Sequence, residues 1–386
     1  MFIIRFIGVK MKQIPLSDID IGEEEIKSVT NILKSKWLSM GPVTQQFERE
    51  FADYLKVKYA FGISSGTAAL HIANRVLGVE KGDEVILPSL TFVATANASL
   101  YCGAKPVFAD ITSLNNFNIS PDDILEKITD KTKAITVVHY GGYPCDMNAI
   151  MEIAEDYNLK IIEDAAHAPG AEYNGKKCGT MGDIGCFSFF ANKNMVTGEG
   201  GMIVTNNDVL AEKIKIIRSH SMTTLTWDRH NGHAYSYDIT DLGYNYRINE
   251  IASALGIVQL SKLDSLNKKR KNIYNEYVRH LETIDEISVP FIDFKWKSSY
   301  HIFPVLLSET LNKYEIIDGL KEKGIQTSIH YPPIHLFSYY KQEFNLDTLI
   351  LPKTEFVANN IISLPLYPEM TKEDVIYVIK SLKELI

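Results

Sequence analysis

The feature that most constrains the fold is a regular alternation of short apolar runs with amphipathic stretches over the first two thirds of the chain. Amphipathic stretches such as GTAALHIANRVLG and MNAIMEIAEDYN have helical periodicity. This alternation favours an open α/β architecture with a parallel sheet covered by helices on both faces, which binds ligands at the carboxyl ends of its strands. The apolar runs expected to form strands are residues 59–63, 83–88, 105–111, 133–139, 160–164, 186–190 and 201–205.

The pattern changes after about residue 250. A long helical run, INEIASALGIVQLSKLDSLNKKRKNIYNEYVRHLE, leads to a mixed tail with SSYHIFPVLL and a final helix, KEDVIYVIKSLKEL. We therefore expect an N-terminal arm and helix over residues 1–40 and a large α/β domain over residues 41–255. A connecting helix and a smaller α+β domain are expected over residues 256–386.

Charge and composition exclude several classes of protein. The net charge of −8, with 40 basic and 48 acidic side chains, disfavours nonspecific nucleic-acid binding, although a local anion site remains compatible with it. No apolar run approaches the length of a membrane span, and the four cysteines form no CxxC pair. We expect a cytoplasmic protein with free thiols that binds neither nucleic acid nor membrane. Met11 opens MKQIPLSDIDIG, which reads like a natural start, so Met1 and Met11 both stay open as start sites.

The motif SSGTAAL (64–70) follows the strand at residues 59–63 and opens a helix. Free backbone N–H groups at a helix N-terminus, Gly66, and the hydroxyls of Ser65 and Thr67 together form an anion cradle. The alternative interpretation is that Ser65 or Thr67 only caps the helix.

A second motif, KIIEDAAHAPGA, ends a strand in Glu163 and Asp164, and His167 lies three residues further on. An acidic residue at the carboxyl end of a strand can face the ligand crevice of an α/β sheet. A turn cap beside a core histidine, a catalytic carboxylate–histidine pair and a metal site all stay open as interpretations.

A third motif, GCFSFFANKNMVTGEGG, places Ser188 in a strand and Lys193 just after it. Lys193 is the one charged residue in this run before Glu199. Burial among apolar and aromatic side chains would lower the pKa of its amine and make it a nucleophile toward carbonyl groups. The alternative interpretation is an ordinary solvated lysine.

Taken together, the three motifs match the needs of one cofactor, pyridoxal 5′-phosphate. Its phosphate binds at a helix N-terminus, its ring nitrogen needs a carboxylate to stay protonated, and its aldehyde needs a lysine for a Schiff base. A single cofactor explains all three motifs, whereas the alternatives require three unrelated explanations.

The chain resembles the DegT/StrS family of sugar aminotransferases from about Ile14 to its C-terminus. The resemblance implies the fold-type I architecture of pyridoxal-phosphate-dependent transferases, with a large domain built on a mostly parallel mixed sheet and a smaller C-terminal α+β domain. The motifs that carry it are SSGTAAL, GDEVILPSLTFVATANA, AKPVFADI, VVHYGG, IIEDAAHAPGA, GDIGCFSFFANKNMVTGEGG, LGYNYRINEIASALGIVQL and IHYPPIH.

The resemblance also implies roles for individual residues. Lys193 would hold the cofactor covalently and act as the catalytic residue, and Asp164 would pair with the ring nitrogen. Phe92 would lie against the ring, and His167 would lie near its phenolic oxygen. The resemblance further implies a homodimer with shared active sites, because Asn245 would reach the phosphate from the neighbouring subunit. The remaining phosphate ligands would be Ser65, Gly66, Thr67 and Ser188.

For the substrates, the resemblance implies glutamate as amino donor and a nucleotide-linked keto sugar as acceptor. A histidine at the position of His167 favours amination at carbon 4, and amination at carbon 3 is the alternative. A pyridoxal-dependent dehydratase or epimerase is disfavoured because Lys193 is present, and a non-enzymatic regulator is disfavoured by the intact cofactor residues. No metal is expected. The expected substrate-binding residues are Trp227, Arg229 and, in the small domain, His330 and His335, with His230 beside the first two. For the segment around Trp227, the alternative interpretation is that it orders the subunit interface.

Overall fold

The computed structural model describes residues 12–224 and 236–386. Within these residues the core is a seven-stranded sheet in the order β1-β11-β10-β7-β6-β2-β3. Neighbouring strands from β10 to β3 are parallel, and β11 runs antiparallel to both β10 and β1, so the sheet is mostly parallel and mixed, as expected. The strands are β1 (Tyr59–Ile63), β2 (Glu84–Pro88), β3 (Lys105–Ala109), β6 (Thr132–Val138), β7 (Lys160–Asp164), β10 (Ile184–Ser188) and β11 (Gly201–Thr205).

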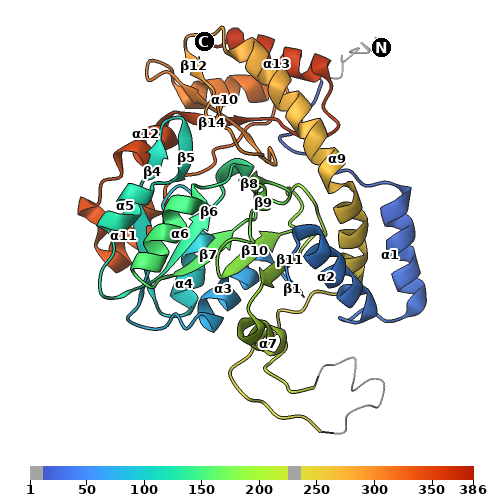
Figure 1. Ribbon diagram of the computed structural model, residues 1–386. Coiled ribbons are helices and arrows are strands. Elements are labelled where there is room, and N and C mark those ends of the chain that lie inside the picture. Colours follow the sequence, from blue (N-terminus) through green and yellow to red (C-terminus); the bar gives the residue numbers. More distant parts are fainter. Residues whose placement is uncertain (1–11, 225–235) are drawn as a thin grey trace, which may run out of the picture.

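Helices cover both faces of this sheet (Figure 1). Along β11, Ile203 packs with α3 (Gly66–Val76) on one face, and Met202 and Val204 pack with α2 (Pro42–Leu55) on the other. Successive side chains of a strand point to opposite faces, so a strand buried on both sides is apolar at every position. One face carries α3 (Gly66–Val76), α4 (Ala94–Tyr101) and α7 (Asp208–Ile217); the other carries α2 (Pro42–Leu55), α6 (Met147–Asp156) and the start of α9 (Glu250–Leu281).

A second, antiparallel sheet forms near the C-terminus from β12 (Ile287–Ser288), β13 (Phe303–Leu307) and β14 (Ile361–Leu364). The end of α9, α10 (Lys313–Glu322) and α13 (Lys372–Lys383) bury its apolar side chains, and α1 (Glu23–Ser35) packs along α9 (Figure 1). None of the helices in the described ranges is both long and apolar enough to cross a bilayer. The shorter elements are β4 (Ile111–Ser113), β5 (Asn116–Ile119), β8 (Glu172–Tyr173), β9 (Lys176–Lys177), α5 (Pro121–Glu126), α11 (Ser338–Phe344), α12 (Pro352–Asn360), η1 (Tyr140–Gly142), η2 (Ile334–Leu336) and η3 (Leu346–Thr348).

The predicted strand at residues 105–111 is two strands in the structure. β3 ends at Ala109, and Ile111 begins β4, which pairs with β5 instead. Asp110 makes the break, because its buried carboxylate accepts hydrogen bonds from the backbone N–H groups of Lys353 (3.1 Å) and Thr354 (2.8 Å). These N–H groups belong to the first turn of α12, where an anionic side chain is favourable.

The strand expected at residues 186–190 begins and ends two residues earlier than predicted. β10 includes Gly185, and a Cβ on that residue would lie 2.0 Å from the carbonyl oxygen of Gly179. A glycine ordinarily weakens a strand, but here it allows close approach of a neighbouring backbone. The chain leaves the sheet after Ser188, so Lys193 lies in the turn beyond it.

The expected domain boundary at residue 255 falls inside α9, which begins at Glu250. The first turns of α9 pack on the large sheet, and its later turns pack on the small sheet. Residues 334–351 return to the large sheet, where Ile334, Tyr340 and Leu351 pack beside β2 and β3. The three-part division of the chain stays a proposal.

Candidate active site

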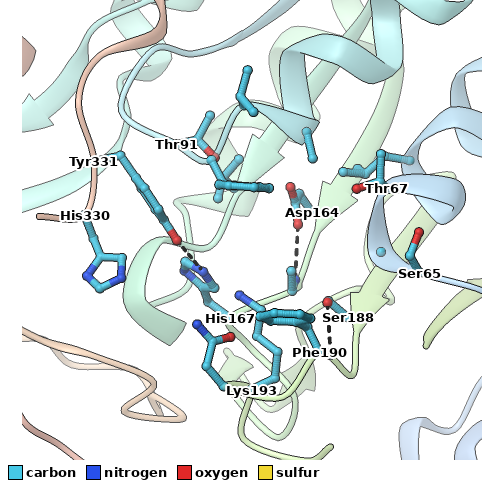
Figure 2. Close-up of a pocket in the computed structure, with 18 of the residues that line it drawn as sticks. Ser65, Thr67, Thr91, Asp164, His167, Ser188, Phe190, Lys193, His330 and Tyr331 are labelled. Atoms are coloured by element: carbon cyan, nitrogen blue, oxygen red, sulfur yellow. Dashed lines mark hydrogen bonds between the residues drawn. The ribbon is translucent and has the colours of Figure 1, made fainter. Parts of the chain in front are cut away.

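A cavity of about 580 Å³ lies where the carboxyl ends of β7 and β10 meet the N-terminus of α3. A loop of the C-terminal segment, residues 328–332, closes one side of it. Figure 2 shows side chains from these separate elements facing a common space. The carboxyl ends of parallel strands are where an α/β sheet is expected to bind its ligands.

The N-terminus of α3 forms one wall of the cavity. Ser65 is the N-cap residue, and its Oγ accepts a hydrogen bond from the backbone N–H of Ala68 at 3.1 Å. The N–H groups of Gly66 and Thr67 have no acceptor among the described residues. Ser65 therefore both caps the helix and lines the cavity, and two free N–H groups remain for an anion.

Gly66 is needed for the close approach of this helix to β10. A Cβ on Gly66 would lie 2.8 Å from the Cβ of Ser188, closer than side chains pack. Ser188 ends β10, and its hydroxyl accepts a hydrogen bond from the backbone N–H of Phe190 at 3.4 Å. The glycine thus brings the Ser188 hydroxyl beside the free N–H groups and completes a cradle for an anion.

Asp164 ends β7 and is 6% exposed. Its Oδ2 accepts a hydrogen bond from the Thr95 hydroxyl at 2.9 Å, and its Oδ1 accepts one from the backbone N–H of Ala166 at 3.2 Å. Burial raises the pKa of this carboxyl, while these hydrogen bonds and the charge of Lys193 oppose the rise. A buried carboxylate of this kind favours a protonated, positively charged partner.

Lys193 lies in the turn after β10, and its backbone N–H donates to the carbonyl of Phe190 at 2.9 Å. The side chain is half-buried and lines the cavity. Burial lowers the pKa of its amine from 10.5 to about 8, against the opposing effect of the Asp164 charge. The uncharged form of the amine, which a nucleophile or general base requires, is therefore much more populated near neutral pH than for an ordinary lysine.

His167 and Tyr331 come from different parts of the chain and meet in the wall of the cavity (Figure 2). The Tyr331 hydroxyl lies 3.0 Å from Nε2 of His167, and the ring of His301 packs 4.3 Å from the His167 ring. Burial lowers the pKa of His167 well below its usual value and that of His330 to about 4, so both rings are neutral at pH 7. Burial also raises the pKa of the Tyr331 hydroxyl, which stays protonated.

Phe92 lies at the mouth of the cavity and is 57% exposed, with its ring centroid 6.2 Å from that of Tyr331. Phe190 also lines the cavity and is 45% exposed. Large apolar side chains with this much free surface are suited to pack against a flat ring.

His335, which is expected to bind the substrate, does not line this cavity. His335 is fully buried outside the cavity, in η2. Its Nδ1 lies 2.7 Å from the hydroxyl of Ser89, and its Nε2 lies 3.3 Å from the carboxylate of Glu355. The 3₁₀ turn rotates it away from His330, which does line the cavity, so His335 joins two parts of the fold.

The other expected site residues do not line this cavity in a single chain. Asn245 is exposed and lies between α7 and α9, where it forms an isolated β-bridge with Ser219. Its predicted contact with a neighbouring subunit therefore stays a prediction. Trp227 and Arg229, with His230 beside them, lie outside the described residues.

Sequence reasoning missed several residues of the site. Thr91 and Tyr331 line the cavity, and Thr95 binds Asp164 from behind it. The motif LTFVAT carried a signal for the threonines, because Thr91 and Thr95 lie four residues apart on either side of Phe92. Tyr331 follows His330 in the motif IHYPPIH.

The residues present fit pyridoxal 5′-phosphate. At the cradle, Gly66 and Ser188 approach too closely for a side chain at position 66, and the free N–H groups there suit a phosphate. The buried carboxylate of Asp164 suits the ring nitrogen, and the Lys193 amine suits the aldehyde. A metal site is not supported by the described residues, which contain no group of three or more suitable ligands.

Comparison with known proteins agrees with this geometry. The family model for the DegT/DnrJ/EryC1/StrS aminotransferases matches residues 19–383. An uncharacterized protein of Methanocaldococcus jannaschii is 43% identical over 370 residues, which cover 95% of this chain and 96% of that protein.

Two solved structures share nearly the whole fold. PseC of Helicobacter pylori, an aminotransferase involved in the biosynthesis of pseudoaminic acid, has a TM-score of 0.91 and 33% identity, covering 97% of this chain and 99% of that chain. The putative sugar aminotransferase Spr1654 of Streptococcus pneumoniae, in its PLP form, has a TM-score of 0.90 and 31% identity, covering 97% of this chain and 98% of that chain. With a family match over nearly its whole length and a cavity that fits the family's chemistry, this chain belongs to the DegT/DnrJ/EryC1/StrS aminotransferase family.

Proposed function

We propose that this sugar aminotransferase uses pyridoxal 5′-phosphate, held covalently by Lys193, to move an amino group from glutamate to a keto sugar carried on a nucleotide. The observation that carries the proposal is the meeting of three groups in one cavity. They are a lysine with its pKa lowered to about 8, a buried carboxylate and the free N-terminus of a helix. Each group suits a different part of the cofactor.

When bound, the cofactor withdraws electrons from the carbon that carries the amino group. Lys193 would hold the cofactor's aldehyde at rest, and its amine, once freed, would move a proton from the donor carbon to a different carbon as general base and acid. A pKa of about 8 suits this task, because a general base works best when its pKa lies near the working pH. Asp164 would stabilise the positive charge of the ring nitrogen.

The charge of the cavity supports a shared active site. Among the described residues that line it, Lys193 is the only lysine or arginine, and His167 and His330 are neutral. The cofactor phosphate, a nucleotide diphosphate and the carboxylates of glutamate all bring negative charge, which basic side chains usually match. We therefore propose a homodimer in which the second copy completes the polar lining.

The segment between α7 and α9 is suited to reach that second copy. The described parts of this segment extend away from the sheet (Figure 1), and Asn245 is exposed near its C-terminal end. Tyr237, Ile239 and Leu242 on the same segment are each at least half exposed. Exposed apolar side chains that cluster on a projecting segment are typical of protein–protein contacts.

For the acceptor we propose a 4-keto sugar, with a 3-keto sugar as the alternative. The support for carbon 4 is the histidine at position 167, which lies in the cavity wall. The involvement of PseC in pseudoaminic acid biosynthesis supports a sugar acceptor in general.

The first test is an absorption spectrum of the purified enzyme with pyridoxal 5′-phosphate, before and after glutamate is added. We expect a yellow band that moves to shorter wavelength with glutamate and is absent in Lys193→Ala. A band that glutamate leaves unchanged would reject glutamate as donor. The aminated enzyme is then offered nucleotide-linked 4-keto and 3-keto sugars, and NMR of the product identifies the aminated carbon.

Shared active sites are tested by mixing two defective variants, Lys193→Ala and Asn245→Ala, after unfolding and refolding them together. Each mixed dimer then carries one site with both residues intact. Random pairing should restore about a quarter of the wild-type activity, since half of the dimers are mixed and each has one intact site. Activity that stays at the level of the separate variants would reject the contribution of Asn245 from a partner.

A further inference from the structure

Two threonines stand behind the buried carboxylate of Asp164. The Thr95 hydroxyl lies 2.9 Å from Oδ2 of Asp164, and the Thr91 hydroxyl lies 3.1 Å from that of Thr95. Thr95 is 1% exposed and Thr91 is 3% exposed, so bulk water does not reach these bonds. Among the described residues, the only other hydrogen bond to the carboxylate comes from the backbone N–H of Ala166, at 3.2 Å.

The direction of these hydrogen bonds follows from the chemistry of the groups. An ionised carboxylate only accepts, so the Thr95 hydroxyl must donate its proton to Asp164. The Thr95 oxygen is then left to accept from the Thr91 hydroxyl. The result is a chain in which each hydroxyl strengthens the next bond, because hydrogen bonds in a dry interior polarise one another.

The same turn of the chain also carries Phe92. The backbone N–H of Thr95 donates to the carbonyl of Phe92 at 3.2 Å, where the loop after β2 becomes α4. Phe92 lines the cavity, whereas the Thr95 hydroxyl turns inward to Asp164. This one turn therefore positions Phe92, which is expected to lie against the cofactor ring. It also supports Asp164, which is expected to pair with the ring nitrogen.

We propose that Thr95 is a positioning residue for the cofactor, whose hydroxyl, backed by Thr91, keeps Asp164 ionised and oriented toward the ring nitrogen. This inference rests on the proposed function, because Thr95 acts on the cofactor only through Asp164. Burial by itself raises the pKa of the Asp164 carboxyl, and the Thr95 hydrogen bond is the largest effect that lowers it. Without that bond, the carboxyl is more readily neutralised and cannot hold a protonated ring nitrogen.

The test is the affinity of the full-length apoenzyme for pyridoxal 5′-phosphate, measured by equilibrium dialysis. Thr95→Val keeps the shape of the side chain and removes the hydroxyl, and we expect about tenfold weaker binding, the usual worth of a hydrogen bond to a charged group. Thr95→Ser keeps the hydroxyl and should restore the affinity to within about threefold of the wild type.

A double-mutant cycle separates this role from a general effect on folding. In the Asp164→Asn background, Thr95→Val should change the affinity by less than about twofold, because the group through which it acts is gone. A matching probe is the cofactor analogue with carbon in place of the ring nitrogen. Its affinity should be nearly the same for the wild type and Thr95→Val.

The outcomes distinguish this inference from the proposed function. If the wild type itself fails to bind pyridoxal 5′-phosphate, the proposed function fails. If the wild type binds the cofactor and Thr95→Val binds it equally well, the positioning role is rejected. It is also rejected if Thr95→Val weakens cofactor binding by the same factor in the Asp164→Asn background as in the wild type. If Thr95→Val does not fold, Thr91→Val serves in its place and should weaken binding about threefold, and an unchanged affinity would again reject the inference.

Discussion

The substitution Glu163→Gln should destabilise the protein strongly, although it changes a single atom. Glu163 is fully buried at the end of β7, next to Asp164. Its Oε1 accepts hydrogen bonds from the backbone N–H groups of Met181 and Gly182, both at 2.6 Å. Its Oε2 accepts from the backbone N–H of Gly179 at 2.7 Å, and Nε2 of His139 lies 3.0 Å away.

A glutamine cannot satisfy this arrangement in either orientation, because one of its two terminal groups is itself a donor. His139 cannot adapt by moving its proton, since its Nδ1 accepts from the backbone N–H of Cys145 at 3.1 Å and its Nε2 must therefore donate. Two buried donors lose their acceptor whichever way the amide turns. Each costs about 1–3 kcal/mol, so we expect a loss of about 4 kcal/mol in the free energy of unfolding.

The assay is thermal unfolding of the apoprotein, followed by circular dichroism. An unfolding entropy of about 2.1 cal/mol/K per residue converts this loss into a fall in melting temperature of about 5 °C for a chain of this length. The matched control is Glu152→Gln on the exposed face of α6, which should change stability by less than about 0.5 kcal/mol. If both variants melt within one degree of the wild type, the reasoning about Glu163 is wrong.

Three further predictions concern the cavity and its supports. Because the pKa of Lys193 falls from 10.5 to about 8 on folding, the unfolded chain binds more protons between these pH values, and stability rises with pH there. The Lys193→Met apoprotein should therefore be more stable than the wild type at pH 7. In chemical denaturation, the difference in free energy of unfolding should shrink as the pH approaches 10.5, and a difference that stays constant with pH would contradict this. Gly66→Ala would bring a Cβ to 2.8 Å from Ser188, so the overpacking should cost about 1–3 kcal/mol and weaken cofactor binding in dialysis, and unchanged binding would argue against the cradle. Ser89→Ala removes the hydroxyl that contacts both Nδ1 and the backbone N–H of His335. It should lower the free energy of unfolding by about 2 kcal/mol in chemical denaturation and leave KM unchanged. A large change in KM would indicate that His335 contributes to substrate binding.

Much of the fold and the chemical core of the site could be predicted from sequence. The large sheet forms from short runs whose central positions are mostly apolar, because both of its faces are covered by helices. Asp164 and Lys193 were predicted as site residues because each lies at or just beyond the carboxyl end of such a run, and Gly66 because it opens the helix after one. These inferences need only neighbours in sequence and the rule that parallel strands end at a common edge.

The sequence did not indicate which distant side chains would support that core. Thr95 binds a carboxylate 69 positions away, and Tyr331 meets His167 from a loop 164 positions away. The resemblance implied that His335 binds the substrate together with His330, yet in the structure His335 lies in η2 and contacts Ser89, 246 positions away.

The sequence by itself therefore determined the order of strands and helices along the chain and the family to which it belongs, and it predicted Lys193 as the lysine of the site. Only the tertiary structure decided which hydroxyl holds Asp164, which histidine faces the cavity and where β3 must stop so that Asp110 can bind α12. The physical reason is that periodicity and motif spacing depend on local backbone geometry, whereas the burial and hydrogen bonding of a polar side chain depend on which segments pack against it.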